Sequence, residues 1–284
     1  MTTTTDIYQT VTDRIIDALE QGTAPWLKPW ADGKAGAQGP YNAVSGRGYN
    51  GINWLVLSCA PYASGGWLTF KQAKELGGSV RKGEKGTQIV FWSFPKIRDK
   101  ETGEDKVVPF AKGYTVFHVE QCDGLDERKL KQPTPIVPGS TSINAIAAQA
   151  GARVNHGGSR AFYSPMSDAI GMPSAEAFKS ADAYAGTLAH ELVHWTGHKD
   201  RCDRQFGKRF GDDAYAFEEL VAEIGSAFLC AQVGIPLDGL QHADYIGSWL
   251  SVLKQDKRAI FTASSQAKKA AEFLLPASEE ALAA

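Results

Sequence analysis

The sequence predicts an α+β protein of two domains, an α+β N-terminal domain and a mostly helical C-terminal domain with a small sheet. Runs of β-branched and aromatic residues indicate strands at 88–94 and 114–119. Apolar residues at helical spacing indicate long helices at 175–198, 213–233, 241–254 and 256–274. A charged, proline-rich stretch separates the two regions and is typical of a linker. We therefore expect domains at 1–125 and 141–284, with the linker at 126–140.

The remaining elements follow from local patterns along the chain. Ile7, Val11 and Ile15 recur at helical spacing and Gly22 follows as a stop, so an amphipathic helix is expected at 6–21. In chain order, the other expected elements are short helices at 53–60 and 69–76, a charged hairpin or loop at 96–106, a helix at 141–150, and short strands at 153–156, 160–163 and 170–173.

Charge is distributed unevenly along the chain. The net charge of −2 excludes a globally basic protein of the histone kind. From Tyr41 to Arg98, however, eight basic residues face two acidic ones, a local balance of +6. From Gly139 to the end, 13 basic residues face 17 acidic ones, a balance of −4. The two halves are therefore expected to face different partners.

Cysteine usage and hydropathy indicate the compartment. The four cysteines lie far apart, without the C-x-x-C pairs of a zinc ribbon or redox motif. The first residues lack a basic region followed by an apolar core, and no stretch approaches the roughly 20 apolar residues needed to cross a bilayer. We expect a cytoplasmic protein with reduced thiols and no membrane partner.

The run from His190 to His194, with Glu191 after the first histidine, is the most specific motif in the chain. Histidines four residues apart lie on one face of a helix, so both imidazoles can bind one zinc ion. The glutamate between them is placed to act as general base on a water molecule. The sequence therefore predicts a zinc-dependent metallopeptidase site with His190 and His194 as ligands and Glu191 as the catalytic residue. The alternative is a helix with two satisfied core histidines.

A catalytic zinc needs a third protein ligand and an open fourth position. His198 lies about 12 Å along a straight helix from His190, which is too far to share the ion. Glu219 and Glu223 share an apolar helix face, so we expect Glu219 as the ligand and Glu223 as the group that orients a zinc-bound imidazole. The reverse assignment stays open. Glu218 points about 100° away from Glu219 and is expected to be a solvated surface acid.

The basic segment of the N-terminal half is also rich in aromatic residues. Single-stranded DNA exposes base faces and phosphates, so a binder needs aromatic platforms interleaved with Lys or Arg. We expect Trp54 and Phe91 in the core, and the aromatic residues of the loops as platforms. The expected DNA-binding residues are Trp26, Trp30, Tyr41, Arg47, Tyr49, Lys71, Arg81, Lys82 and Lys85. For the basic turn at 79–87, a plain solvated hairpin is the alternative.

The motifs together resemble the ArdC antirestriction family, over nearly the whole chain. The zinc segment at 190–198 and the acidic helix at 218–225 are similar to the family's zincin-type metallopeptidase domain. The stretches at 46–53 and 67–90 are similar to its N-terminal single-stranded DNA-binding domain, which is also found fused to plasmid primases. The resemblance implies a plasmid-borne protein that protects incoming single-stranded DNA during conjugation.

The leading hypothesis is an enzyme with one Zn²⁺ per chain, or another divalent transition metal. It would bind single-stranded DNA and cleave a protein substrate, with proteins bound to the same DNA as the expected targets. Tyr245 and His242, near the start of a later helix, could stabilise the oxyanion. Two alternatives come from other classes: a non-catalytic DNA-coating protein with a structural metal, and an accessory protein for replication or priming. An intact Glu191 favours catalysis, because a structural site has no use for a general base.

Overall fold

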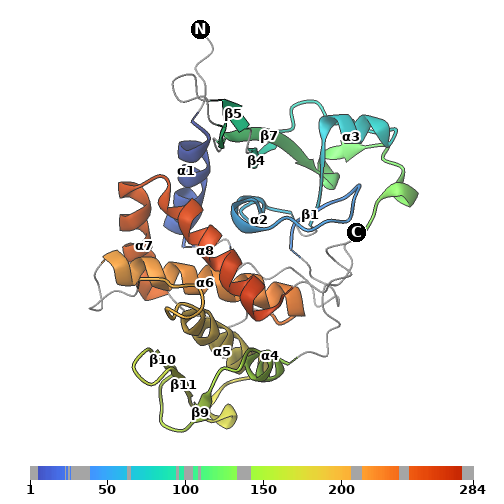
Figure 1. Ribbon diagram of the computed structural model, residues 1–284. Coiled ribbons are helices and arrows are strands. Elements are labelled where there is room, and N and C mark those ends of the chain that lie inside the picture. Colours follow the sequence, from blue (N-terminus) through green and yellow to red (C-terminus); the bar gives the residue numbers. More distant parts are fainter. Residues whose placement is uncertain are drawn as a thin grey trace.

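The computed structural model describes residues 6–22, 24, 26, 39–62, 65–93, 96–98, 105–107, 110–132, 142–205, 213–236 and 243–276. The fold class is α+β, as predicted. An N-terminal half with a curled sheet joins a largely helical C-terminal half with a small sheet (Figure 1). Within the described residues, no helix is both long and apolar enough to cross a membrane.

The N-terminal half is built around a sheet with the strand order β1-β2-β7-β4. Its strands are β1 (Tyr41–Asn42), β2 (Gly66–Thr69), β4 (Thr87–Ser93) and β7 (Phe110–His118), of which β1 and β2 are parallel and the other pairs antiparallel. Two small ladders accompany this sheet: β3 (Ser79–Val80) with β8 (Cys122–Asp123), and β5 (Lys96–Arg98) with β6 (Asp105–Val107). The long strands β4 and β7 and the β5–β6 hairpin were predicted, whereas β1, β2, β3 and β8 were not.

Three helices belong to the same half, and all were predicted. They are α1 (Ile7–Glu20), α2 (Gly51–Ser58) and α3 (Phe70–Glu75). Asp6 caps α1 by accepting a hydrogen bond from the backbone N–H of Tyr8. Thr69 and Gln72 form a capping box at the start of α3.

The C-terminal half places a three-stranded sheet against a helical layer. Its elements are α4 (Ile143–Ala150), β9 (Val154–His156), β10 (Phe162–Ser164), β11 (Ala169–Met172), α5 (Ala181–Thr196), α6 (Asp213–Val233), α7 (Ala243–Gln255) and α8 (Ala259–Leu274). The sheet order is β10-β11-β9. The predicted helix at 175–198 is shorter in the structure, because Ser180 caps α5 and residues 175–177 form a separate 3-10 turn.

One hydrophobic core connects the two halves. The apolar faces of α1 and α2 pack against α7 and α8, and the fully buried Ile15 belongs to the same cluster as the residues of α5 and α6 (Figure 1). The Trp26 and Trp249 rings meet with centroids 5.6 Å apart, and those of Trp54 and Phe228 lie 5.3 Å apart. Trp54 is a core residue, as predicted.

Polar contacts reinforce the junction of α1 with the end of the chain. The Thr12 hydroxyl donates to the backbone carbonyl of Lys257 at 2.7 Å. The ammonium of Lys257 pairs with Asp6 at 2.5 Å, and Lys254 pairs with Glu20 at 2.6 Å. Helix α1 is therefore held to the connection between α7 and α8.

Of the expected linker at 126–140, the structure describes residues 126–132. Residues expected in the linker are integrated in the N-terminal half: the Asp126 N–H donates to the Leu76 carbonyl, and the Lys131 N–H donates to the Ala43 carbonyl. The two halves also share one core within the described residues, so they pack directly against each other. The proline-rich part lies outside the described residues, so the domain boundary stays a prediction.

We predict that the chain unfolds in one cooperative transition to which both halves contribute. Ile15→Ala should cost about 2–5 kcal/mol, because it leaves a cavity in the shared core, whereas the exposed Asp17→Ala should have little effect. Urea unfolding followed by tryptophan fluorescence and by circular dichroism measures this. Two separate transitions, with Ile15→Ala moving only one, would contradict a shared core.

Candidate metal centre

The middle of the C-terminal half brings two polar helix faces together inside apolar surroundings. On α5, His190 and His194 lie one turn apart and are buried together with Glu191. On α6, Glu219 and Glu223 lie one turn apart and are also buried. Apolar neighbours such as Leu192 have no exposed surface.

The two helices can approach closely because residue 225 is a glycine. A Cβ atom at Gly225 would lie 2.8 Å from a methyl group of Val193 on α5, well inside van der Waals contact. A larger residue would push α6 away from α5. The glycine thus keeps the carboxylates of α6 within reach of the imidazoles.

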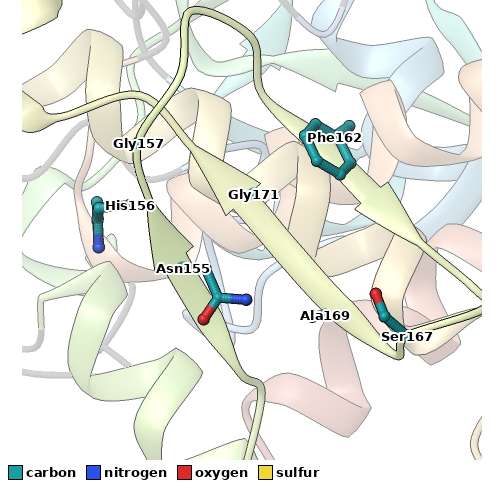
Figure 2. A pocket seen from close by; sticks show the side chains of 7 residues that line it. All are labelled: Asn155, His156, Gly157, Phe162, Ser167, Ala169 and Gly171. Atoms are coloured by element: carbon teal, nitrogen blue, oxygen red, sulfur yellow. The ribbon is translucent and has the colours of Figure 1, made fainter.

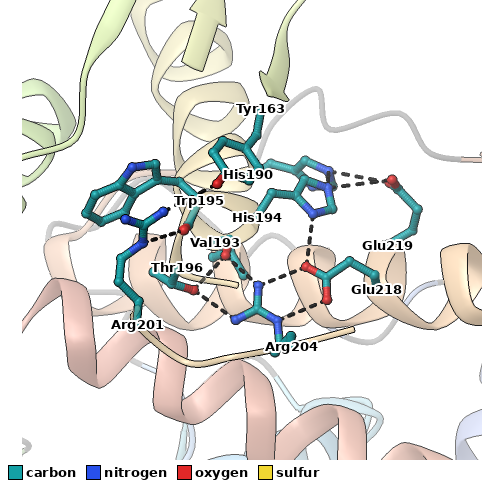
Figure 3. A network of polar contacts seen from close by, with 10 residues as sticks. All are labelled: Tyr163, His190, Val193, His194, Trp195, Thr196, Arg201, Arg204, Glu218 and Glu219. Atoms are coloured by element: carbon teal, nitrogen blue, oxygen red, sulfur yellow. Dashed lines mark hydrogen bonds and ion pairs between the residues drawn. The ribbon is translucent and has the colours of Figure 1, made fainter. Parts of the chain in front are cut away.

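The two imidazoles and the Glu219 carboxylate converge at one point (Figure 3). The Nε2 atoms of His190 and His194 lie 3.1 Å apart, and each lies 3.5 Å from a Glu219 oxygen. Among the described residues, these three side chains form a group whose potential ligand atoms are close enough together to hold one metal ion. A tetrahedral ion with bonds of about 2.0–2.1 Å has ligand atoms roughly 3.3–3.4 Å apart. The three side chains therefore fit a divalent transition metal.

Each imidazole has a second carboxylate on its other nitrogen. His190 Nδ1 lies 3.4 Å from Glu223 Oε1, and His194 Nδ1 lies 3.1 Å from Glu218 Oε1. Such partners place the proton on Nδ1 and leave Nε2 for the metal. The geometry thus favours Glu219 as the third ligand and Glu223 as the orienting group.

Arg204 extends the arrangement around His194 (Figure 3). Its guanidinium donates to both oxygens of Glu218, at 2.9 and 2.8 Å, and to the Val193 carbonyl and the Thr196 hydroxyl. Arg204 lies on the turn that follows α5, where its backbone N–H donates to the Gly197 carbonyl. The turn therefore folds back over the end of α5 and covers Glu218.

This contact corrects the prediction for Glu218. The sequence indicated a solvated acid, but its carboxylate is 3% exposed. Helix geometry predicts that Glu218 points away from Glu219. It does not predict that the turn after α5 folds back over Glu218, because no local sequence pattern indicates that turn. Arg204 is only 7% exposed, and its contact with Glu218 was not predicted.

The pKa shifts agree with a site that attracts positive charge. Burial by itself lowers the pKa of His190, but the Glu219 and Glu223 carboxylates outweigh it and raise that pKa well above its usual value. Burial raises the pKa of Glu218, but hydrogen bonds from His194 and Arg204 more than reverse it. The cluster therefore favours a cation between its carboxylates.

Other residues proposed for the site lie elsewhere. His198 falls after the end of α5, where its Nδ1 accepts a hydrogen bond from the Asp200 N–H, and it is not part of the ligand group. His242 and the side chain of Tyr245 lie outside the described residues, so their role stays a prediction.

The expected DNA-binding residues differ in how exposed they are. Trp26 has no exposed surface and Tyr41 is 8% exposed, so neither ring can serve as a stacking platform. Arg81 is engaged by Glu84 and Asp123. Lys82 and Lys85 are exposed. Arg47 and Lys71 are also exposed, and Tyr49 is half-buried. Trp30 lies outside the described residues.

A second arginine ties the small sheet to α5. Arg201 pairs with Asp168, donates to the Trp195 carbonyl and lies with its guanidinium 3.8 Å from the centroid of the Trp195 ring. The Tyr163 hydroxyl donates to the same carboxylate at 3.0 Å. Burial and Asp168 raise the pKa of Tyr163 to about 12, so this donor stays protonated at neutral pH.

A hollow of about 300 Å³ lies on the small sheet (Figure 2). His156, Phe162 and Ser167 are among its lining residues. The lining includes one imidazole and no carboxylate, so it does not form a second metal site.

Comparisons with known proteins agree with this site. A zincin-like metallopeptidase family matches residues 141–266, and the N-terminal domain of anti-restriction factor ArdC matches residues 5–117. The metal-free crystal structure of the antirestriction ArdC protein from plasmid R388 is 46% identical, with a TM-score of 0.78, over 95% of this chain and 96% of that chain. The chain belongs to the ArdC antirestriction family. The Mn(II)-bound structure of the R388 protein is equally similar, at 44% identity and a TM-score of 0.78.

Other relatives are a protein of similar length and two much longer proteins. The uncharacterized protein y4eC of Sinorhizobium fredii (strain NBRC 101917 / NGR234) is 38% identical, over 96% of this chain and 92% of its own length. A DNA primase TraC of Escherichia coli is 41% identical over 94% of this chain. This chain spans 27% of that primase, and 20% of a second TraC with 38% identity.

The ligand assignment makes a first prediction for this ArdC-family centre. Glu219→Gln should abolish tight metal binding, because it removes a ligand, whereas Glu223→Gln should keep one metal per chain with about 10–100-fold lower affinity. Metal analysis and titration calorimetry with Zn²⁺ and Mn²⁺ measure both. The reverse order of effects would exchange the two roles.

Arg204 makes a second prediction. Arg204→Met should weaken metal affinity about 10–100-fold, because Glu218 no longer orients His194, and should destabilise the chain by about 3–5 kcal/mol, because it strands a buried carboxylate. The double variant Arg204→Met, Glu218→Gln should regain stability but not metal affinity. Arg160→Met, at an exposed arginine, is the control. Unchanged affinity in both variants would limit Arg204 to a purely structural role.

Proposed function

We propose that this chain is a plasmid-type antirestriction protein that binds single-stranded DNA, carries a zinc-dependent peptidase site and protects DNA that enters the cell by conjugation. The observation that carries the enzymatic part is the buried group of His190, His194 and Glu219 beside the intact Glu191. A purely structural site would need the ligands but not the adjacent glutamate.

The residues of the site would divide the chemistry between them. His190, His194 and Glu219 would hold the metal, which when bound supplies Lewis-acid polarisation of a water molecule and of the substrate carbonyl. Glu191 takes the proton of the attacking water on its carboxylate and returns it to the nitrogen of the departing amine. Glu223 and Glu218 hold the imidazole protons at Nδ1, so the ligand geometry is set in advance.

Zinc is the metal that we propose, because two imidazoles and one carboxylate are a common set for a catalytic zinc site. The R388 relative was crystallised with Mn(II). Ligand atoms 3.1–3.5 Å apart fit more than one first-row metal. Selection between metals would then follow their supply in the cell.

DNA binding rests on the composition of the N-terminal half and on its family match. The basic balance of +6 between Tyr41 and Arg98 would attract phosphates. The family match at residues 5–117 covers the same region. The proposed protein substrates are proteins bound to the same strand, because a shared strand raises their effective concentration.

The shared core changes how the two activities would be coupled. A flexible tether would let the peptidase search along the strand, whereas one continuous body fixes the direction in which the site faces relative to the DNA. A substrate would then need to lie at a defined position on the strand. This supports selective rather than general proteolysis.

An accessory role in priming is the second candidate, favoured by the 41% identity to a TraC primase. This chain matches about a quarter of that protein, so the priming chemistry would belong to another chain or region.

The decisive variant is Glu191→Gln, which removes the base and keeps the shape. We expect metal content and DNA binding to stay at wild-type levels and cleavage of a DNA-bound protein to fall by at least about 100-fold. The assay follows cleavage with and without single-stranded DNA, and plasmid transfer into a restricting host measures protection. Full protection by Glu191→Gln would favour the DNA-coating role over proteolysis.

A further inference from the structure

Four aromatic side chains on the long strands of the N-terminal sheet are exposed; three of them share one face, whereas Trp92, at 37% exposed, lies on the other face. Phe91 is 57%, Phe110 56% and Tyr114 41% exposed. The sequence placed Phe91 in the core, and this is wrong. Large rings are costly to leave in water, so a group of them on one surface usually marks a contact site.

The strand register places these rings on one face. In the β4–β7 ladder, Phe91 pairs with Lys112, and Ile89 pairs with Tyr114, while Phe110 pairs with Ser93. Side chains two residues apart on a strand point to the same side, and paired residues share that side. The rings of Phe91 and Tyr114 meet edge to face, with centroids 5.9 Å apart.

A positive charge accompanies the rings. The Lys112 ammonium lies 5.1 Å from the centroid of the Tyr114 ring, and neither β4 nor β7 contains an acidic residue. Lys85, two residues before β4, is also exposed. An anionic partner therefore meets no opposing carboxylate on these two strands.

The opposite face of the ladder packs in part against the rest of the protein. Val90 is buried in the shared core, and Trp92 meets the ring of Tyr8 on α1 with centroids 6.1 Å apart. The Cδ1 atom of Ile7 fills the space in front of Gly113. The exposed rings thus lie at the uncovered end of their face, beyond the part of that face where Ile89 and Val116 are packed.

We propose that Phe91, Lys112, Tyr114 and Phe110 form the surface on which this chain stacks single-stranded DNA. Aromatic rings bind base faces without regard to sequence, and a lysine between them pairs with the phosphate of a stacked nucleotide. Duplex DNA hides its base faces and cannot use the rings. This inference rests on the proposed function. The exposed rings take the stacking role that the sequence had assigned to Trp26 and Tyr41, which are buried.

The position of the surface fits the shared core. The sheet and the small C-terminal sheet lie at opposite ends of the molecule in Figure 1, with α6 and α8 between them. Single-stranded DNA stacked on the rings of β4 and β7 would leave the metal centre free for a protein that approaches from another side.

Binding of the full chain to a labelled oligothymidine is the test, measured by fluorescence anisotropy over a range of salt concentrations. Phe91→Ala and Tyr114→Ala should each weaken binding at least about fivefold, with an unchanged salt slope. Lys112→Ala should reduce that slope by about one. The matched control is Phe162→Ala, which removes a ring that is 54% exposed on β10 and should bind like the wild type.

The outcomes separate this surface from the proposed function. Unchanged metal content and melting temperature in the variants show that the fold is intact, because the replaced side chains are exposed. Wild-type chain that binds no single-stranded DNA overturns the DNA-binding part of the proposed function. Wild-type chain that binds, with Phe91→Ala and Tyr114→Ala equally tight, overturns this surface alone. A loss of self-association in the variants without loss of DNA binding also overturns it, in favour of a contact between two copies of the chain.

Discussion

Charge buried between α5 and α6 is the constraint on which the rest of the structure depends. Carboxylates are costly to remove from water unless each has a partner. The fold provides these partners in pairs: Arg204 and His194 for Glu218, and the two imidazoles for Glu219. Gly225 of α6, the turn that carries Arg204 and the apolar residues around the site together set the distance between α5 and α6. A divalent ion satisfies the same requirement, which explains why a site with so many acids can be buried at all.

The shared core extends that constraint to the DNA-facing half. Helix α2 contacts both α8 and strand β4, so the N-terminal sheet is supported by the helical layer that also carries the metal centre. The Asn53 side-chain amide adds a specific link, because it bonds both the N–H and the C=O of Val90 in β4. The proposed DNA surface and the candidate metal centre are therefore parts of one packed unit, and their relative orientation is a property of the fold.

The sequence predicted the elements whose signal is local. Helical periodicity indicates which residues share a face, and it predicted the group of His190, His194 and Glu219 that the structure brings together as a candidate metal site. It says nothing of what covers a face, and Glu218 was misplaced for that reason. The predictions for Phe91 and Trp26 were the reverse of what the structure shows, for the same reason. Whether a ring is buried depends on α1, α2 and α7, which are distant in sequence. Strands of two to four residues such as β1 and β2 carry too short a pattern to recognise and are specified by their pairing with longer strands.

The contact of α1 with the far end of the chain also determines when the protein can finish folding. Ile15 and Leu19 are buried against helices that end at residue 274. During synthesis at about 5–20 residues per second, α1 leaves the ribosome roughly 10–50 s before its partners. For that time its apolar face is open to chaperones and to other nascent chains. Pairings between distant segments also slow folding itself, because a long loop must close before they form. A newly made chain therefore completes its shared core only after α7 and α8 have been synthesised.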